Sequence, residues 1–159
     1  MPATAMSLVY LLDLERRRVL LGLKHRGLGT SLILGLGGHV EPGETSAEAA
    51  MREVLEEGGV VVDPADLTPV GQVRFRFPFK PSWDQDVDVF TATRWAGEPH
   101  AASDEITPRW YAMERPPLER MWDDARYWFP EILAGGTVDA TFVFAEDNAT
   151  VAERVPAGS

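Results

Sequence analysis

The chain has 159 residues, of which 45% are hydrophobic and 25% are charged, a composition typical of one globular domain. Its 15 Lys and Arg and 25 Asp and Glu give a net charge of -10, which disfavours nucleic acid and anionic membrane surfaces as partners. Without any cysteine, the chain has no disulfides, thiolate metal sites or cysteine nucleophiles. Its N-terminal apolar stretch, Leu8–Leu12, is too short for a signal sequence or a membrane span, so we expect a cytoplasmic protein.

The first elements are predicted from apolar runs and turn residues. Residues 8–14 and 19–23 flank a polar turn and predict an antiparallel strand pair. The next stretch holds six glycines and one proline between residues 27 and 43, and it predicts loops whose backbone a ligand could approach. Thr45 then begins a helix, because Thr45 and Glu48 have capping-box spacing, and the Gly58-Gly59 pair should end it.

The rest of the chain alternates strands with connections. We expect strands at residues 60–62, 73–77, 87–91, 108–112 and 137–144, and a second helix within residues 118–133. The segment from Asn148 onward is polar and contains proline, which predicts a frayed and flexible tail. Without a repeat or a long linker, the pattern predicts a single α/β sandwich domain over residues 1–159, with its core in about residues 7–145.

The first helix concentrates three carboxylates on one face. At about 100° per residue, Glu53, Glu56 and Glu57 fall within one arc. The opposite face carries the apolar side chains Ala47, Met51, Val54 and Leu55. A solvated acidic face would explain an isolated glutamate pair, but it does not explain the glycine-rich loop that leads into the helix. A Mg²⁺ ion explains both, because it takes carboxylate and backbone carbonyl oxygens as ligands. Zinc is disfavoured because the three histidines are scattered.

These residues form a family pattern. From Gly38 the chain reads Gly38, five residues, Glu44, seven residues, and then Arg-Glu-Val-Leu-Glu-Glu-Gly-Gly-Val from Arg52 to Val60. This resembles the Nudix box, G-x5-E-x7-R-E-U-x-E-E-x-G-U with U aliphatic, at every specified position. The resemblance implies an α/β/α Nudix sandwich with a mixed sheet. It also implies Mg²⁺-dependent hydrolysis of a nucleoside diphosphate linked to another group, with Mn²⁺ as a possible substitute.

The resemblance also implies roles for residues of the box. Glu53, Glu56 and Glu57 would hold the metal ions together with the Gly37 carbonyl. Arg52 would belong to the catalytic set and, with Glu44, would orient these carboxylates.

Stretches outside the box are similar to the mammalian type of MutT homologue, the oxidised purine nucleoside triphosphatases. They are residues 20–24, 71–77, 103–105, 121–124 and 127–130, and the likeness extends from about residue 8 to residue 144. By this resemblance, the substrate would be a purine nucleoside triphosphate such as 8-oxo-dGTP, and the products the monophosphate and pyrophosphate. Lys24 would contact the nucleotide, and Glu105 would add a metal ligand or a base. The base pocket would be lined by Phe75, Phe77, Trp122 and Asp124.

Apart from the resemblance, the same residues have structural explanations. Trp122 and the neighbouring Trp128 could be core aromatics, and Phe75 and Phe77 share one strand face that suits a core. The Asp123-Asp124 pair suits the start of a helix, where carboxylates are favourable. Spacing alone would make Lys24 and Glu105 ordinary surface charges.

The expected base pocket departs from the family at three apolar positions. Leu34 stands where the family has an Asn before the Gly-x-Gly-Gly loop, and Val9 stands where it has a Thr. Ala125 replaces the second Asp of a Trp-Pro-Asp-Asp run, unless a local shift restores the pair from Asp123 and Asp124. Because a lost buried hydrogen-bond partner costs about 1 to 3 kcal/mol, we expect an altered base preference with more weight on stacking.

Two classes of function remain open. The first is a hydrolase, with nucleoside triphosphates as the leading substrates and dinucleoside polyphosphates or nucleotide sugars as alternatives. The second is a ligand sensor that kept the fold without catalysis, although such a module has no need for three repelling carboxylates. We expect a nucleotide as the partner, no nucleic acid or membrane, and a monomer or weak dimer.

Overall fold

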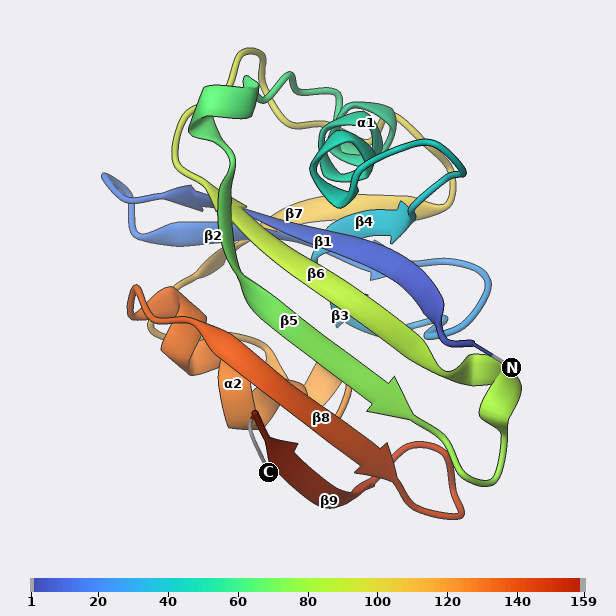
Figure 1. The fold of residues 1–159 in the computed structure, drawn as a ribbon. Coiled ribbons are helices and arrows are strands. Elements are labelled where there is room, and N and C mark those ends of the chain that lie inside the picture. Colours follow the sequence, from blue (N-terminus) through green and yellow to red (C-terminus); the bar gives the residue numbers. More distant parts are fainter. Residues whose placement is uncertain (1, 158–159) are drawn as a thin grey trace.

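The computed structural model describes residues 2–157, in which a nine-stranded mixed sheet has helix α1 on one face and helix α2 on the other (Figure 1). The strands are β1 (Thr4–Asp13), β2 (Arg18–Lys24), β3 (Ile33–Leu34), β4 (Leu36–His39), β5 (Thr68–Arg76), β6 (Gln85–Ala92), β7 (Ile106–Ala112), β8 (Val138–Phe144) and β9 (Val151–Pro156). The helices are α1 (Ser46–Gly58) and α2 (Ala125–Leu133), and short 3-10 turns lie at Pro64–Asp66, Pro81–Trp83 and Leu118–Arg120. The predicted α/β sandwich is confirmed.

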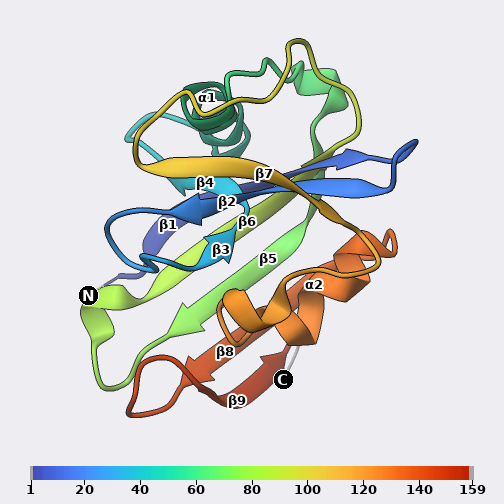
Figure 2. The ribbon, with the colours of Figure 1, turned by 180° about the vertical axis from the view of Figure 1, so that it is seen from behind.

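The sheet has the order β3-β2-β1-β6-β5-β8-β9, with β4 also paired to β1 and β7 also paired to β2. The β1–β6 and β5–β8 pairs are parallel and the other pairs are antiparallel, so the sheet is mixed, as the resemblance implied. The predicted hairpin at the N-terminus is confirmed as β1 and β2, with Leu11 opposite Leu20. Figure 2 shows, from behind, β7 lying along β2 and α2 lying over the half of the sheet that contains β5 and β8.

Successive side chains of β1 enter different layers of the sandwich. Val9 is buried in a cluster that includes Val54 of α1, whereas Tyr10 is buried in a cluster that includes Trp128 and Phe129 of α2. This is the ordinary alternation of a strand, in which neighbouring Cβ atoms point to opposite faces. A shift of one residue along β1 therefore moves a side chain from one core to the other.

The predicted start and end of helix α1 are confirmed. The Thr45 hydroxyl accepts a hydrogen bond from the Glu48 N–H, and the Glu48 carboxylate accepts one from the Thr45 N–H, which completes a capping box. Gly59 ends the helix in the left-handed conformation, at φ 70°. The placement of Leu55 on the apolar face was wrong: it is 48% exposed, because it lies about 100° around the helix from the buried Val54.

Two predictions around the apolar and glycine-rich segments were wrong. Residues 60–62 form no regular strand; Val61 makes a single bridge to Ala96, while Val60 and Val62 are buried in the α1 cluster. Their apolar side chains serve burial rather than sheet pairing. Conversely, the glycine-rich stretch expected to form loops contains β3 and β4, because its backbone pairs with β2 and β1.

The C-terminal segment is also more ordered than its composition predicted. Val151–Pro156 forms β9, which pairs antiparallel with β8, so the prediction of a frayed tail from Asn148 was wrong. An edge strand tolerates polar residues on its exposed face, which explains the error. The second helix is confirmed but shorter than its aromatic pattern, since it begins at Ala125. Within residues 2–157, neither helix is long and apolar enough to cross a membrane.

Candidate functional site

A cavity of about 550 Å³ opens on the α2 side of β1 and reaches to the carboxylates of α1. This volume lies within the range of small-molecule sites. Its wall has an acidic part, defined by Lys24, Gly37, Glu53, Glu57 and Glu105. It also has an aromatic part, defined by Tyr10, Phe75, Phe77, Trp122, Asp124, Trp128 and Phe144. One continuous space therefore joins charged groups suited to phosphates with rings suited to a base.

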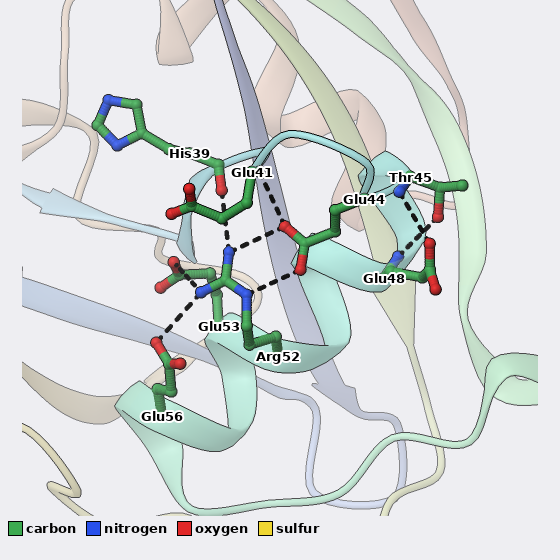
Figure 3. A network of polar contacts seen from close by, with 8 residues as sticks. All are labelled: His39, Glu41, Glu44, Thr45, Glu48, Arg52, Glu53 and Glu56. Carbon is green, nitrogen blue, oxygen red and sulfur yellow. Dashed lines mark hydrogen bonds and ion pairs between the residues drawn. The ribbon is translucent and has the colours of Figure 1, made fainter.

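Arg52 organises the carboxylates around α1 (Figure 3). Its guanidinium donates to both oxygens of Glu44, at 2.8 and 3.0 Å, and to Glu53 Oε1 at 2.9 Å. It also reaches the His39 carbonyl at 3.1 Å and Glu56 Oε2 at 3.3 Å. These bonds lower the pKa of Glu44 to about 2, with the side-chain bonds from Arg52 as the main cause. The planar fork of arginine thus fixes Glu44 and orients Glu53.

Glu57 is the most deeply buried carboxylate of the acidic part. It is 8% exposed, and its Oε1 accepts a hydrogen bond from the Gly37 N–H at 2.8 Å. Burial raises the pKa of Glu57 to about 8; the negative charges of Glu53 and Glu105 raise it further, while Lys24 and the Gly37 N–H oppose the rise. The pKa of Glu53 is also raised, chiefly by burial. This part of the cavity therefore holds more negative charge than its one lysine can offset.

The glycines of β4 allow the backbone to approach its neighbours closely. A Cβ at Gly37 would lie 1.9 Å from the Ser7 carbonyl oxygen, and one at Gly38 would lie 2.6 Å from Glu53 Oε1. The first distance, to backbone, leaves no room for a side chain at Gly37, whereas a side chain at Gly38 would require the Glu53 carboxylate to move. The glycines noted in the sequence therefore allow the β4 backbone to lie against β1 and the helix carboxylates.

The aromatic part is built on a stacked pair of buried rings. Phe77 stacks on Phe144 with centroids 4.6 Å apart and planes 9° apart, and both rings are almost fully buried. Trp122 sets its edge against both, at 5.8 and 6.2 Å, and is only half-buried. Phe75 is also half-buried and packs against Phe144. Phe77 and Phe144 thus support Trp122 and Phe75, which keep exposed ring surface.

Asp124 is a buried carboxylate with one free oxygen. It is 2% exposed, its Oδ2 accepts a hydrogen bond from Trp128 Nε1 at 2.7 Å, and its Oδ1 has no partner. Burial raises the pKa of Asp124 to about 7, despite the opposing hydrogen bond from Trp128. Because an unpartnered buried polar atom is costly, Oδ1 is a candidate contact for a ligand in the cavity that Asp124 lines.

Comparison with known proteins agrees with this geometry. Residues 1–132 match the NUDIX domain model. The chain belongs to the Nudix family. It is 42% identical over 130 residues to an oxidized purine nucleoside triphosphate hydrolase from Danio rerio, and 40% identical over 131 residues to one from Mus musculus. Each match covers 82% of this chain and 81% of the relative.

Solved structures share the Nudix fold of this chain. A MutT protein from Bacillus halodurans superposes with a TM-score of 0.80 at 23% identity, over 98% of this chain and 99% of its own. A bifunctional NMN adenylyltransferase/ADP ribose pyrophosphatase from Francisella tularensis, in complex with AMP and a manganese ion, superposes with a TM-score of 0.63 at 21% identity. That match covers 84% of this chain and 42% of the other.

Nudix hydrolases generally act with divalent metal ions, and the donor atoms of the acidic part suit one. Within residues 2–157, no three Asp, Glu or His side chains are arranged to hold a metal ion as they stand. Glu53 and Glu56 bond to Arg52, and Glu57 bonds to the Gly37 N–H, so ligation of a cation would exchange these contacts. The available donors are oxygens, the ligands of hard cations, and a cation would offset the charge that raises the pKa of Glu57.

Most residues singled out in the sequence line this one cavity. They are Lys24, Leu34, Gly37, Glu53, Phe75, Phe77, Glu57, Glu105, Trp122 and Asp124. Arg52, Glu56 and Asp123 do not line it. Arg52 and Glu56 lie outside, bonded to each other. Asp123 is turned away, because its Oδ2 accepts the Val151 N–H at 2.8 Å and its carboxylate pairs with Arg126.

Tyr10 and Phe144 of the aromatic part were missed in the sequence, and Val9 was misplaced. The expectation that Val9 faces the base pocket was wrong, since Val9 is fully buried towards α1 and does not line the cavity. The next residue, Tyr10, lines it instead. The alternation of β1 indicates that Val9 and Tyr10 point to opposite faces of the sheet. It does not indicate which of the two faces α2.

Proposed function

We propose that this Nudix protein hydrolyses oxidised purine nucleoside triphosphates, with water, to the nucleoside monophosphate and pyrophosphate. The observation that carries the proposal is the single cavity joining the acidic part to an aromatic part that contains a buried carboxylate with a free oxygen. The names of the relatives that are 40–42% identical give it independent support. Such an activity would remove damaged nucleotides from the pool of nucleic-acid precursors.

The acidic part would act on the phosphates. Mg²⁺, with Mn²⁺ as a possible substitute, would neutralise the phosphate charge and activate water when it is bound by Glu53, Glu56, Glu57 and Glu105 with the Gly37 carbonyl. Arg52 would keep Glu53 and Glu56 oriented, since it already bonds both. Lys24 lines the acidic part and would contact the phosphates; burial lowers its pKa, but Glu57 and Glu105 favour its charged form.

The aromatic part would bind the base. Trp122 and Phe75 would stack on the purine, with Phe77 as their support and Leu34 as an apolar contact. Asp124 would bond the base edge through Oδ1, while Asp123 would serve only to tie the start of α2 to β9. Stacking accepts any purine, so discrimination would rest on the few polar groups that meet the base edge.

A substrate panel tests the proposal. The protein is assayed with 8-oxo-dGTP, dGTP, dATP, a dinucleoside polyphosphate and a nucleotide sugar, each with Mg²⁺, with Mn²⁺ and with a chelator. We expect the highest kcat/KM for an oxidised purine triphosphate, no turnover with the chelator, and pyrophosphate as the first product. Release of orthophosphate first, or a preference for the nucleotide sugar, would contradict the proposal. Glu146→Gln, at an exposed position outside the cavity, serves as a control and should retain full activity.

The remaining expectations about the whole protein belong to the same proposal. A single catalytic domain over residues 1–159, acting as a monomer or weak dimer in the cytoplasm, would suit an enzyme of free nucleotides. Its net charge of -10 opposes binding to nucleic acid. Light scattering of the purified chain, with and without nucleotide, measures the oligomeric state.

A further inference from the structure

Tyr10 is a cavity residue to which neither the Nudix box nor the proposed reaction gives a role. It lies in the middle of β1, is 1% exposed, and lines the aromatic part. Its ring packs on Phe129, with centroids 4.8 Å apart, and against the edge of Trp128 at 6.2 Å. An apolar side chain of similar size would make the same packing contacts, so the hydroxyl needs a separate explanation.

The ring of Tyr10 lies close to Gly35, and its hydroxyl is influenced by the charge of Asp124; both residues also line the cavity. A Cβ added at Gly35 would lie 2.7 Å from Cε1 and 2.9 Å from Cζ of the tyrosine ring, so only glycine leaves room for that edge of the ring. The Gly35 N–H opposes a rise in the pKa of the Tyr10 hydroxyl. Burial, and then the nearby charge of Asp124, raise the pKa of Tyr10 well above its usual value, so the hydroxyl keeps its proton. A protonated hydroxyl is a hydrogen-bond donor, and Tyr10 lines the cavity, so it can donate to a ligand there.

The cavity wall carries apolar side chains at two positions of the expected base pocket. Leu34 and Ala125 line the same cavity with apolar side chains, at positions where the family that the sequence resembles has hydrogen-bonding groups. Asp124 Oδ1 has no partner within the protein, so Tyr10 does not bond to it. Tyr10, with its hydroxyl, and Asp124, with its unpartnered Oδ1, therefore both line the cavity.

We propose that Tyr10 is a specificity-determining residue whose hydroxyl donates a hydrogen bond to the edge of the purine base, beside the contact made by Asp124 Oδ1. This inference rests on the proposed function, because it requires a purine in the aromatic part. A fixed donor favours bases that present a carbonyl oxygen or an unprotonated ring nitrogen at that point. It penalises bases that present an amino group there, since two donors would then face each other.

Tyr10→Phe tests the inference because it removes one oxygen and keeps the ring. Binding of 8-oxo-dGMP, dGMP and dAMP is measured by calorimetry, and kcat/KM is measured for the corresponding triphosphates. We expect the ratio of affinities among the three bases to change by about tenfold, with little change in Tm. Tyr127→Phe is the matched control: Tyr127 lies outside the cavity with its ring against Phe142, and its variant should leave every ratio unchanged.

Other outcomes would overturn the inference. Equal loss of affinity for all three bases would make Tyr10 a packing residue, and unchanged affinities would remove the hydroxyl from recognition. If Tyr10→Phe does not fold, Gly35→Ala provides the second test, because its Cβ would displace the ring edge while leaving the hydroxyl; an unchanged ratio would refute the inference. A parent protein that binds the monophosphates but hydrolyses no triphosphate would contradict the proposed function alone, since the base ratios remain measurable.

Discussion

The unfolding free energy should depend on pH through Asp124. This carboxyl is 2% exposed, and burial raises its pKa from 3.8 to about 7. The unfolded chain therefore loses this proton near pH 4, whereas the folded protein keeps it until about pH 7. The stability that comes from the protonated form is complete below pH 3.8 and is lost as the pH rises through 7.

The size of the effect follows from the two pKa values. A difference of one in pKa corresponds to about 1.4 kcal/mol, so Asp124 should lower the unfolding free energy by about 2 kcal/mol at pH 5 and about 4 kcal/mol at pH 8, relative to a group that never ionises. Asp124→Asn supplies such a group. Its amide oxygen can still accept the hydrogen bond that Trp128 Nε1 donates to Asp124 Oδ2 at 2.7 Å.

Denaturant unfolding of parent and variant, without metal or nucleotide, measures the prediction at several pH values. The stability advantage of Asp124→Asn over the parent should grow by about 2 to 3 kcal/mol between pH 5 and pH 8. Comparing the two proteins cancels the other titrating groups, including Glu57. Glu146→Gln should instead follow the parent curve. Parallel curves for Asp124→Asn and the parent would show that Asp124 is already ionised in the folded protein and would refute the reasoning.

Four further substitutions test the site. Glu57→Gln should lower kcat by orders of magnitude and, without metal at neutral pH, raise Tm, because it removes a carboxyl whose pKa is raised to about 8 by folding and which therefore ionises more easily in the unfolded chain; near-normal turnover would exclude this residue from metal binding. Arg52→Lys cannot reproduce the two bonds to Glu44, so kcat should fall about 10- to 100-fold with unchanged helix content by circular dichroism. Asp123→Ala should cost about 1 to 3 kcal/mol in denaturant unfolding while leaving base ranking intact, and an altered ranking would count against its structural role. Trp122→Ala should weaken binding of all purine monophosphates together, by about 1 to 3 kcal/mol, and a base-selective loss in calorimetry would contradict a stacking role.

The boundaries of α1 and the residues of the Nudix box could be predicted from the sequence, because they depend on residues that are close together in the chain. The capping box of Thr45 and Glu48 and the glycines after α1 act within a few residues, so they define the helix before any tertiary contact is known. Positions three and four apart share a helix face, which placed Glu53 and Glu57 together towards one cavity. The box of residues 38–60 was sufficient to indicate the family, because its spacing is fixed by one loop and one helix.

Only the tertiary structure decided how deeply each of these groups is buried. Glu56 is exposed and Glu57 is buried, although they are neighbours, because Glu57 alone lies under the Gly37 backbone of β4. The same holds for the aspartate pair before α2. Asp123 is engaged by Val151, 28 residues away, while Asp124 lines the cavity, bonds to Trp128 and keeps one oxygen without a partner.

The assignment of strand faces and edges was likewise beyond the sequence. A period of two shows that Val9 and Tyr10 point in opposite directions, but not which direction meets α2, since that depends on the sheet order and on helices more than thirty residues away. β9 was missed for a related reason: its pairing energy comes from β8 and its polar side chains face outward. Local periodicity thus determined the elements and the chemistry of the box. Contacts between distant segments determined which side chains line the cavity, because burial is a property of the packed chain and not of any one segment.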